Sequence, residues 1–447
     1  MLEANDVMSG GLADQDRRDR TFLRLALPLA IIGSLLFLIA PRTSPGLVAA
    51  LGLGALLWSD PGQLIARMRP DRWLIPPALL LIYLVVNATW TTDPPRAITG
   101  LGLFAALLLV VWLSARGLAR MPEAHRARLA RGVAAAALVG TAYLLIEELT
   151  DQGLKQTLYN LLPALRPDEK HLVMDGDTIK RVQPYVTNRN MAALVMSVWA
   201  VLLVLRSQKL VAGRSATVAI AGLALAVIVT VASSTHETSG IALASGGAVL
   251  ALAHVSRRAA LIALSIAWAA ATLLVVPAVS TAYQNGLHFA SWLPDTARHR
   301  IIIWGYTAEQ IPNQPLLGVG LGSTKILDAR REAEYRTPPG YNYPRRTGTH
   351  SHNIYLQIWY ELGGLGALLA CACGLTLLAG ITRLPDASRP YAFATFAACA
   401  SYAGFAWGLW QPWYMASFAV AAMLMLICAG ATGAANALAP GQAPARS

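Results

Sequence analysis

Long apolar blocks separated by short polar connections follow one another along most of the chain. Several blocks approach the roughly 20 residues that an α-helix needs to cross a bilayer. The pattern predicts an all-α polytopic membrane protein with about 12 transmembrane helices. The predicted spans are residues 24–41, 44–59, 73–91, 96–115, 132–149, 190–206, 215–233, 239–255, 259–282, 353–382, 390–410 and 413–434.

Composition supports this class and excludes several others. Of the 447 residues, 55% are apolar and 13% are charged, and the mean hydropathy is +0.48, whereas about a quarter of the residues of a soluble domain are charged. The first twenty residues are polar and charged, which is not the pattern of a cleavable signal peptide. All four cysteines lie within apolar spans, so we expect them to pack rather than to form disulfides or bind zinc.

Basic residues alternate between the two sides of the predicted membrane. Most arginines lie in the N-terminal tail and in every second connection. By the positive-inside rule this alternation predicts that both termini are cytoplasmic. The net charge of +12 is then explained by short anchors beside the membrane, so nucleic-acid binding is not expected. The anchors are Arg17, Arg18, Arg20, Arg24, Arg67, Arg69, Arg72, Arg116, Arg120, Arg126, Arg128, Arg131, Arg206, Lys209, Arg214, Arg257, Arg258, Arg383 and Arg389.

Two connections are long, and the same alternation places both on the outer side. The second carries eight Lys or Arg against five acids. Long loops escape the positive-inside rule, so we expect this cationic excess to bind an anionic ligand. Residues 296–311 and 323–335 within it have the pattern of short helices. The predicted order is tail 1–23, spans within 24–149, first outer loop 150–189, spans within 190–282, main outer loop 283–352, spans within 353–434 and tail 435–447.

His352 stands where the main loop meets the tenth predicted span. The free N–H groups at a helix N-terminus disfavour imidazolium, so we expect a neutral ring near pH 7. A neutral imidazole can accept a proton, which makes His352 a candidate general base; the alternative is an interfacial histidine that caps the helix. His350 does not face His352 at helical spacing, so a metal site built on this pair is not expected.

Two further motifs have both a functional and an ordinary interpretation. Asp175 and Asp177 form a D-G-D sequence that could hold a divalent cation with a diphosphate, but it is also an ordinary turn sequence. The glycines of "GVGLG" (318–322) lack the spacing of a nucleotide-binding loop. We expect a tight turn there that brings the backbone close to the site or to a neighbouring helix.

Three blocks of sequence, in order, resemble a known family. "HN" at His352 is followed by nine residues, Gly363, two residues and Gly366. Upstream lie "RIIIWGYTAEQIPNQPLLGVGLG", which begins at Arg300, and "VTNRNMAALV", which contains Arg189. Together they resemble bacterial O-antigen ligases, whose superfamily also contains O-antigen polymerases and bacterial O-oligosaccharyltransferases.

The resemblance implies a multi-spanning glycosyltransferase that uses lipid-linked sugars in lipopolysaccharide biosynthesis. Such enzymes move a glycan from undecaprenyl pyrophosphate to a sugar hydroxyl of lipid A-core, at the periplasmic face of the bacterial inner membrane. The implied reaction inverts the anomeric centre and needs no metal or other cofactor. His352 would be the base, and Arg189 and Arg300 would bind the pyrophosphate. Substrate contacts are expected from Trp304, Asn353, Arg345 and Arg346.

Each assignment has a structural alternative. Arg189 could only reach toward the membrane interface, Arg300 and Trp304 could form a surface cation–π pair, and Arg345 and Arg346 could simply keep a loop solvated. An O-antigen polymerase or a protein O-oligosaccharyltransferase would use the same donor. A lipid-linked glycan transporter would also have many spans, but its ionisable residues would lie near the bilayer midplane rather than in the loops.

Overall fold

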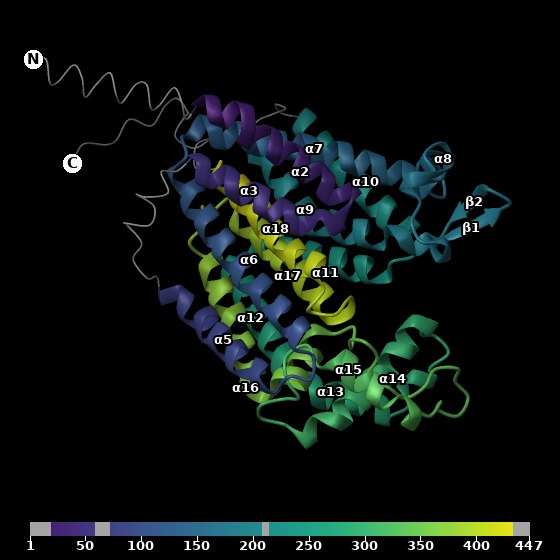
Figure 1. Cartoon of the computed structure of the whole chain (residues 1–447). Coiled ribbons are helices and arrows are strands. Elements are labelled where there is room, and N and C mark those ends of the chain that lie inside the picture. Colours follow the sequence, from purple (N-terminus) through teal and green to yellow (C-terminus); the bar gives the residue numbers. More distant parts are fainter. Residues whose placement is uncertain (1–18, 59–71, 208–213, 432–447) are drawn as a thin grey trace, which may run out of the picture.

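The fold is that of an all-α polytopic membrane protein. The computed structural model describes residues 19–58, 72–207 and 214–431 (Figure 1). Its α-helices are α2 (Leu27–Ile39, after a π-helical turn at Phe22–Ala26), α3 (Ser44–Trp58), α5 (Ile75–Asn87), α6 (Pro94–Arg120), α7 (Glu123–Leu149), α8 (Gly153–Leu161), α9 (Asn188–Ser207), α10 (Arg214–Ser233), α11 (Glu237–Val255), α12 (Arg257–Leu273), α13 (Val275–Gln284), α14 (Asp295–Gln310), α15 (Thr324–Arg330), α16 (Ile354–Ile381), α17 (Arg389–Phe405) and α18 (Pro412–Gly430).

Within the described residues, helices lie in each of the twelve segments that the sequence predicts to cross the membrane; residue 59 and residues 432–434 of these segments lie outside the described residues. Among the described residues, eight helices are long and apolar enough to span a bilayer, and the bent pair α12–α13 would make a ninth. The remaining apolar helices are shorter: α5 has 13 residues, α3 has 15 and α17 has 17. The polytopic class is therefore confirmed, while eight or nine helices meet the length of a full span instead of about twelve.

The predicted span 259–282 is wrong as a single helix. It is broken at Leu274, and α12 and α13 meet at an angle of 65°. Pro277 explains the break, because its ring would collide with the carbonyl of Leu273 if the helix continued. As a result α13 leaves the bundle and packs against α14.

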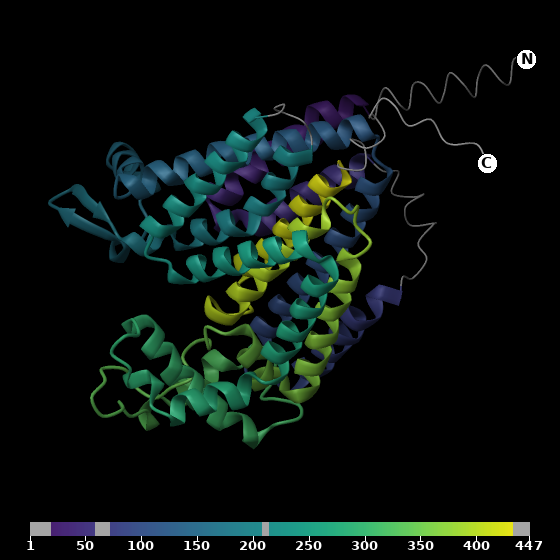
Figure 2. The same cartoon turned by 180° about the vertical axis from the view of Figure 1, so that it is seen from behind.

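The bundle is organised around α18 and α9, whose side chains are mostly buried. α18 packs on α3, α6, α7 and α9, while α11 pairs with α17 and α12 with α16. Figures 1 and 2 show that α2 begins and α18 ends at one end of the bundle. Both long loops project from the other end (Figure 1).

The second long loop folds into a unit of its own, which we call the loop domain (residues 275–352). It contains α13, α14 and α15 and lies beside the ends of α16 and α12 (Figure 2). The helices expected at 296–311 and within 323–335 are present as α14 and as α15 followed by a 3-10 turn.

The first long loop contains α8 and a small hairpin, which the sequence did not predict. Strands β1 (Leu172–Asp175) and β2 (Thr178–Val182) pair antiparallel, and Gly176 at φ +58° lies in the turn between them. The D-G-D sequence is thus a hairpin turn, the ordinary interpretation of that motif.

The glycine-rich turn 318–322 is built into α16. Gly363 has φ +66° and ψ −170°, which interrupts the helix. The amide N–H of Val319 donates to the carbonyl of Tyr360 (3.0 Å), and that of Gly364 donates to Pro315 (2.8 Å). The turn therefore replaces helical hydrogen bonds that the kink has opened, and the expectation of a close backbone approach is confirmed.

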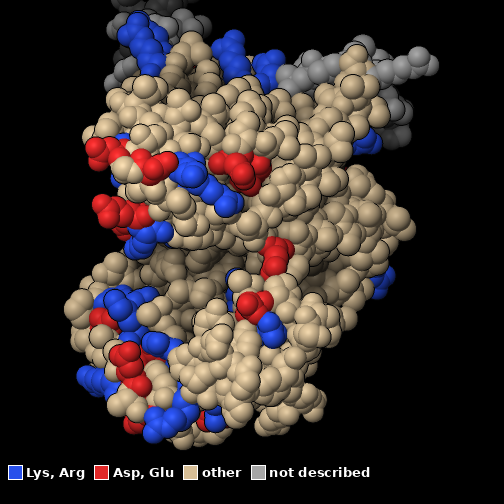
Figure 3. Space-filling view, turned by 90° about the vertical axis from the view of Figure 1, so that its right-hand side faces the viewer, with Lys and Arg blue, Asp and Glu red and all other residues tan. Residues whose placement is uncertain are grey.

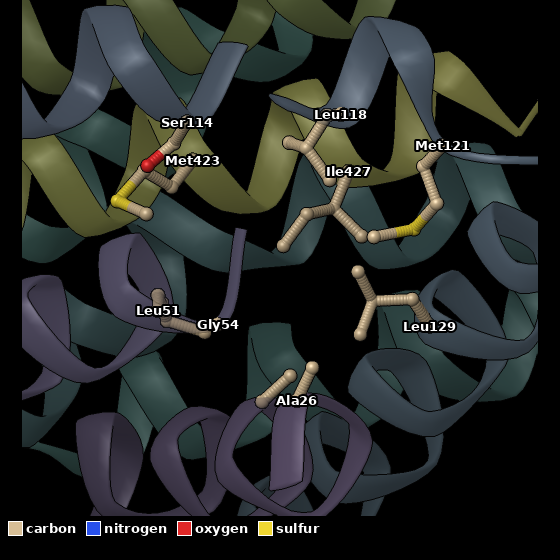
Figure 4. A pocket seen from close by; sticks show the side chains of 10 residues that line it. Ala26, Leu51, Gly54, Ser114, Leu118, Met121, Leu129, Met423 and Ile427 are labelled. Atoms are coloured by element: carbon tan, nitrogen blue, oxygen red, sulfur yellow. The ribbon is translucent and has the colours of Figure 1, made fainter. Parts of the chain in front are cut away.

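A small cavity inside the bundle is part of the core and has no polar site. Its volume is about 20 Å³, and it lies among Ala26, Leu51, Leu118, Leu129 and Ile427 (Figure 4). The hydroxyl of Ser114 in its wall already donates to the carbonyl of Val110 (2.6 Å). A buried water needs two to four polar partners, so this cavity is expected to stay dry.

We expect Gly363→Ala to destabilise the protein by about 2 kcal/mol or more. An added Cβ would be strained at a positive φ and would overlap the backbone of Leu316 and Leu317. Gly247→Ala is the matched control, because a Cβ at that helical position meets nothing within 4 Å and should change stability by about 1 kcal/mol at most. Thermal unfolding in detergent measures both; equal melting temperatures for the two variants would contradict the proposed role of the kink.

Candidate active site

The segment that carries His352 is fixed from both sides. Asn353 caps α16, and its side chain accepts a hydrogen bond from the N–H of Leu356 (3.0 Å). On the other side the indole N–H of Trp304 donates to the carbonyl of Ser351 (2.7 Å). His352 itself has φ +54°, which is uncommon for a residue other than glycine and is held here by its neighbours.

The imidazole of His352 has one nitrogen occupied and one available. Its Nδ1 lies 2.6 Å from the carbonyl oxygen of Ala406, in the connection between α17 and α18. A carbonyl only accepts, so Nδ1 carries the hydrogen and Nε2 keeps its lone pair in the neutral ring. Among the residues that the structure describes, Nε2 makes no hydrogen bond.

Burial keeps this ring neutral. It lowers the pKa of His352 from 6.5 to about 4, with smaller contributions from Arg300 and His299 in the same direction, while the hydrogen bond to Ala406 raises the pKa. The sequence analysis expected a neutral ring because of the helix N-terminus; desolvation is the larger cause. At neutral pH the side chain is therefore in the form that can accept a proton.

Arg300 lies near this imidazole and is not neutralised. It is half-buried on α14, one helical turn before Trp304, and burial lowers its pKa, which the nearby Glu237 partly offsets. Within the described part of the chain, Arg300 makes no hydrogen bond or ion pair and has no cation–π contact with Trp304. A half-buried guanidinium that makes no ion pair with the described residues is a candidate anion-binding group.

Arg189 lies in a separate pocket of about 350 Å³ that Arg42, Lys155 and His171 also line. Its guanidinium lies over the ring of Trp413 (5.3 Å), and its Nε is buried without a hydrogen-bond partner. Among the described residues, no acidic side chain lines this pocket. The arrangement favours an anion, as expected for an arginine that does more than reach toward the membrane interface.

Trp407 connects the Arg189 pocket with the surroundings of Arg300. Its ring lines the pocket and stacks on His236 at 5.1 Å. His236 in turn interacts electrostatically with Arg300. The two arginines predicted to act together therefore belong to neighbouring parts of one region, with the 406–411 connection between them.

Arg345 and Arg346 are both engaged in ion pairs. Arg345 pairs with Glu309, and its guanidinium lies between the rings of Tyr283 and Tyr306, 5.6 Å from each.

Figure 3 shows basic and acidic side chains gathered above and below a hollow on the face that bears the long loops.

Arg346 pairs with Asp328, which is almost fully buried. The same carboxylate accepts hydrogen bonds from the N–H of Gly348 (2.8 Å) and from the hydroxyl of Tyr335 (2.8 Å). These contacts fold the segment that leads into His352, so Arg346 has a structural role beside any contact with substrate.

A buried carboxylate beneath the site ties three segments together. Glu361 on α16 accepts hydrogen bonds from the N–H of Gly322 (2.9 Å), from Gln357 (3.1 Å) and from the indole of Trp410. It thereby joins the glycine-rich turn, α16 and the connection that supplies the Ala406 carbonyl. Sequence reasoning missed Glu361, although an acid inside an apolar span is a recognisable signal.

His236 was missed as well. It stands alone in the short polar connection "SSTHETS" between two predicted spans. Its importance depends on Trp407 and Arg300, which come from distant parts of the chain. The two ring nitrogens of His350 differ from those of His236. The hydroxyl of Thr349 lies 3.1 Å from Nδ1 of His350, and Nε2 is buried and has no hydrogen-bond partner among the described residues.

No group of three or more His, Cys, Asp or Glu side chains with the arrangement of a metal site occurs among residues 19–58, 72–207 and 214–431. His350 and His352 precede α16, and their ring centroids are 4.2 Å apart, so the expectation that these two side chains do not face each other is wrong. The Nδ1 of His352 is already committed to a carbonyl.

Comparison with known proteins shows which family part of this chain resembles. Residues 222–371 match the family model described as O-antigen ligase. A protein of Rickettsia typhi named as a candidate polysaccharide ligase is 26% identical over 192 residues, which cover 42% of this chain and 45% of the relative. A second such protein, from Rickettsia prowazekii, is 39% identical over 79 residues, 17% of this chain and 18% of the relative. The chain thus spans less than half the length of the curated relatives it matches.

Fold and site together define a polytopic membrane protein with a neutral histidine and with two arginines, Arg189 and Arg300, that make no ion pair within the described residues, beside a folded loop domain. The matched segment contains His236, Arg300, Trp304 and His352 and ends within α16. Over residues 222–371 the chain is similar to the O-antigen ligase family.

Nitrogen NMR of ¹⁵N-histidine-labelled protein tests the state of His352. We expect hydrogen on Nδ1 and none on Nε2 at pH 7, with a titration midpoint near 4. His352→Gln assigns the signal. Because the unfolded ring binds protons below about 6.5 and the folded ring only below about 4, this residue should make stability fall as the pH falls through that window. A midpoint near 6.5 would contradict the structure.

Proposed function

We propose that the protein is an O-antigen ligase. It transfers a polysaccharide from undecaprenyl pyrophosphate to a sugar hydroxyl of lipid A-core in lipopolysaccharide biosynthesis. The observation that carries the proposal is His352, a neutral imidazole with a free Nε2 next to the unpaired Arg300. The similarity of residues 222–371 to the O-antigen ligase family and the polysaccharide-ligase relatives support a glycosyltransferase of the ligase or polymerase type.

His352 acts as the general base. Its Nε2 takes the proton of the acceptor hydroxyl as the oxygen attacks the anomeric carbon of the donor sugar. The Ala406 carbonyl fixes the tautomer by accepting from Nδ1, and it stabilises the imidazolium that forms. Trp304 and Asn353 hold the backbone on both sides, so their role is to position the base.

Arg300 and Arg189 bind the pyrophosphate that leaves. Charge grows on the bridging oxygen as the glycosidic bond breaks, and fixed guanidinium groups stabilise it. The oxygen attacks from the side opposite the departing pyrophosphate, so the configuration at the anomeric carbon is inverted. In this account the arginines supply the positive charge, and the transfer is proposed to need neither metal nor another cofactor.

The proposal also assigns an orientation. The long loops face the periplasm and the two ends of the chain face the cytoplasm of a bacterial inner membrane, as the distribution of arginines favours. Both lipid-linked substrates then reach the site from the outer leaflet.

Glycan transfer by purified protein tests the function. We expect His352→Ala to lower kcat by about 10²–10⁴-fold, the usual contribution of a general base. Arg300→Gln should lower it by about 10²–10³-fold, since one stabilising donor is lost. Arg336→Ala is the control: Arg336 lies in the same loop domain and is exposed, and its side chain donates to the backbone carbonyls of Ala333 and Tyr335.

The substrates decide between the related activities. The reaction offers glycan-linked undecaprenyl pyrophosphate with lipid A-core, with and without EDTA. Elongation of the carrier-linked glycan with no transfer to lipid A-core would identify a polymerase instead. Loss of transfer in EDTA would restore a metal role for Asp175 and Asp177, and full activity of His352→Ala would remove the proposed base.

A further inference from the structure

His236 is a buried histidine held by aromatic rings at the edge of the site. It occupies the N-cap position of α11, where its side chain makes no capping hydrogen bond, and only 6% of it is exposed. Its ring stacks on Trp407 at 5.1 Å and on Tyr402 at 6.1 Å. A capping hydrogen bond would explain a polar residue at this position, but the side chain of His236 makes none. The presence of the two buried ring nitrogens therefore needs another explanation.

A chain of hydrogen bonds favours one tautomer of His236. The hydroxyl of Tyr402 donates to the carbonyl of Met191 (3.4 Å), which can only accept. The hydroxyl of Ser239 therefore donates to Tyr402 (2.7 Å), and Nδ1 of His236 donates to Ser239 (2.7 Å). This order leaves the lone pair on Nε2, for which the described residues offer no hydrogen-bond partner.

The connection that carries His236 joins the two cationic parts of the site. Thr235 contacts Asn188 next to Arg189, with its hydroxyl 3.5 Å from the amide oxygen. On the other side, Glu237 accepts from the hydroxyl of Thr296 on α14 (3.3 Å) and interacts electrostatically with Arg300. His236 therefore stands between the groups proposed to hold the pyrophosphate.

We propose that His236 binds the donor sugar: its Nε2 accepts a hydrogen bond from a hydroxyl of the sugar that is attached to the pyrophosphate. This inference rests on the proposed function. In the donor, the first sugar is bonded directly to the pyrophosphate, which Arg300 and Arg189 are proposed to bind. That sugar then lies beside the two arginines, where the His236–Trp407 pair is found. The face of Trp407 and a fixed acceptor nitrogen are the kinds of groups that recognise a sugar ring and its hydroxyls.

The role of His236 differs from that of His352. His352 receives the proton of the acceptor hydroxyl, whereas His236 only accepts a hydrogen bond and no proton moves. Burial and the nearby Arg300 lower the pKa of His236 to about 3, so the ring stays neutral and acts as an acceptor at any pH at which the enzyme would work. His236 is accordingly a binding residue for the donor glycan.

Binding in lipid nanodiscs tests the inference with two ligands: glycan-linked undecaprenyl pyrophosphate from cells that make this protein, and undecaprenyl pyrophosphate alone. His236→Phe keeps a flat ring between Trp407 and Tyr402 but removes both nitrogens. His236→Gln places an oxygen acceptor near the position of Nε2. His254→Phe is the control, because His254 lies at the other end of α11 and contacts Tyr391 edge-on.

We expect His236→Phe to weaken binding of the glycan-linked donor about three- to tenfold, the size of one neutral hydrogen bond. Binding of undecaprenyl pyrophosphate alone should not change, and His236→Gln should recover part of the loss. Unchanged donor binding in His236→Phe would overturn the inference, as would an equal loss for both ligands, which indicates a structural or phosphate-binding role.

The failure of this inference can be told apart from the failure of the proposed function. If the wild-type protein binds neither ligand, the proposed donor is wrong and the role of His236 falls with it. If the wild-type protein binds both ligands and His236→Phe binds them equally well, the donor stands and only His236 is excluded.

Discussion

The site depends on the backbone hydrogen bonds between α16 and the glycine-rich turn. At Gly363 the helix opens, and the freed groups bind Pro315, Leu316, Val319 and Gly320 in place of their helical partners. Unpaired backbone groups inside a membrane protein are costly, so this exchange is what allows a break there. It fastens the loop domain to the helix whose first turn follows His352.

Side-chain hydrogen bonds from Asn87 and Glu361 also stabilise the junction between α16 and the glycine-rich turn. The side chain of Asn87 on α5 donates to the carbonyl of Leu317 (2.9 Å) and accepts from the N–H of Leu321 (2.7 Å). Glu361 then links the turn to Trp410 and thus to the connection that holds the Ala406 carbonyl. This network joins the glycine-rich turn, α16 and the 406–411 connection, and His352 lies eleven residues before Gly363.

Much of the fold could be predicted from the sequence because hydrophobic length and arginine placement are local signals. Helices lie at each predicted span. Pro277 within 259–282 is a local signal for the kink between α12 and α13. The hairpin at 172–182 was not predicted, since its strands are short and alternate weakly. A turn at D-G-D was foreseen only as an alternative.

The site was harder to predict because its meaning depends on contacts between distant segments. Arg300 lowers the pKa of His352 electrostatically, a proximity that the sequence alone does not reveal, and the roles of both residues stay predictions. The sequence does not reveal that Glu309 and Asp328 pair with Arg345 and Arg346, since each pair joins different parts of the loop domain. His236 gains its significance from Trp407, which lies 171 residues later in the chain.

The measurement that tests the central claim most directly is an electron cryomicroscopy structure in nanodiscs with undecaprenyl pyrophosphate bound. The account predicts phosphate density in contact with Arg300 and Arg189, on the side of His352 where Nε2 is free. Density for the phosphates elsewhere, or with Nε2 of His352 facing away from them, would contradict it.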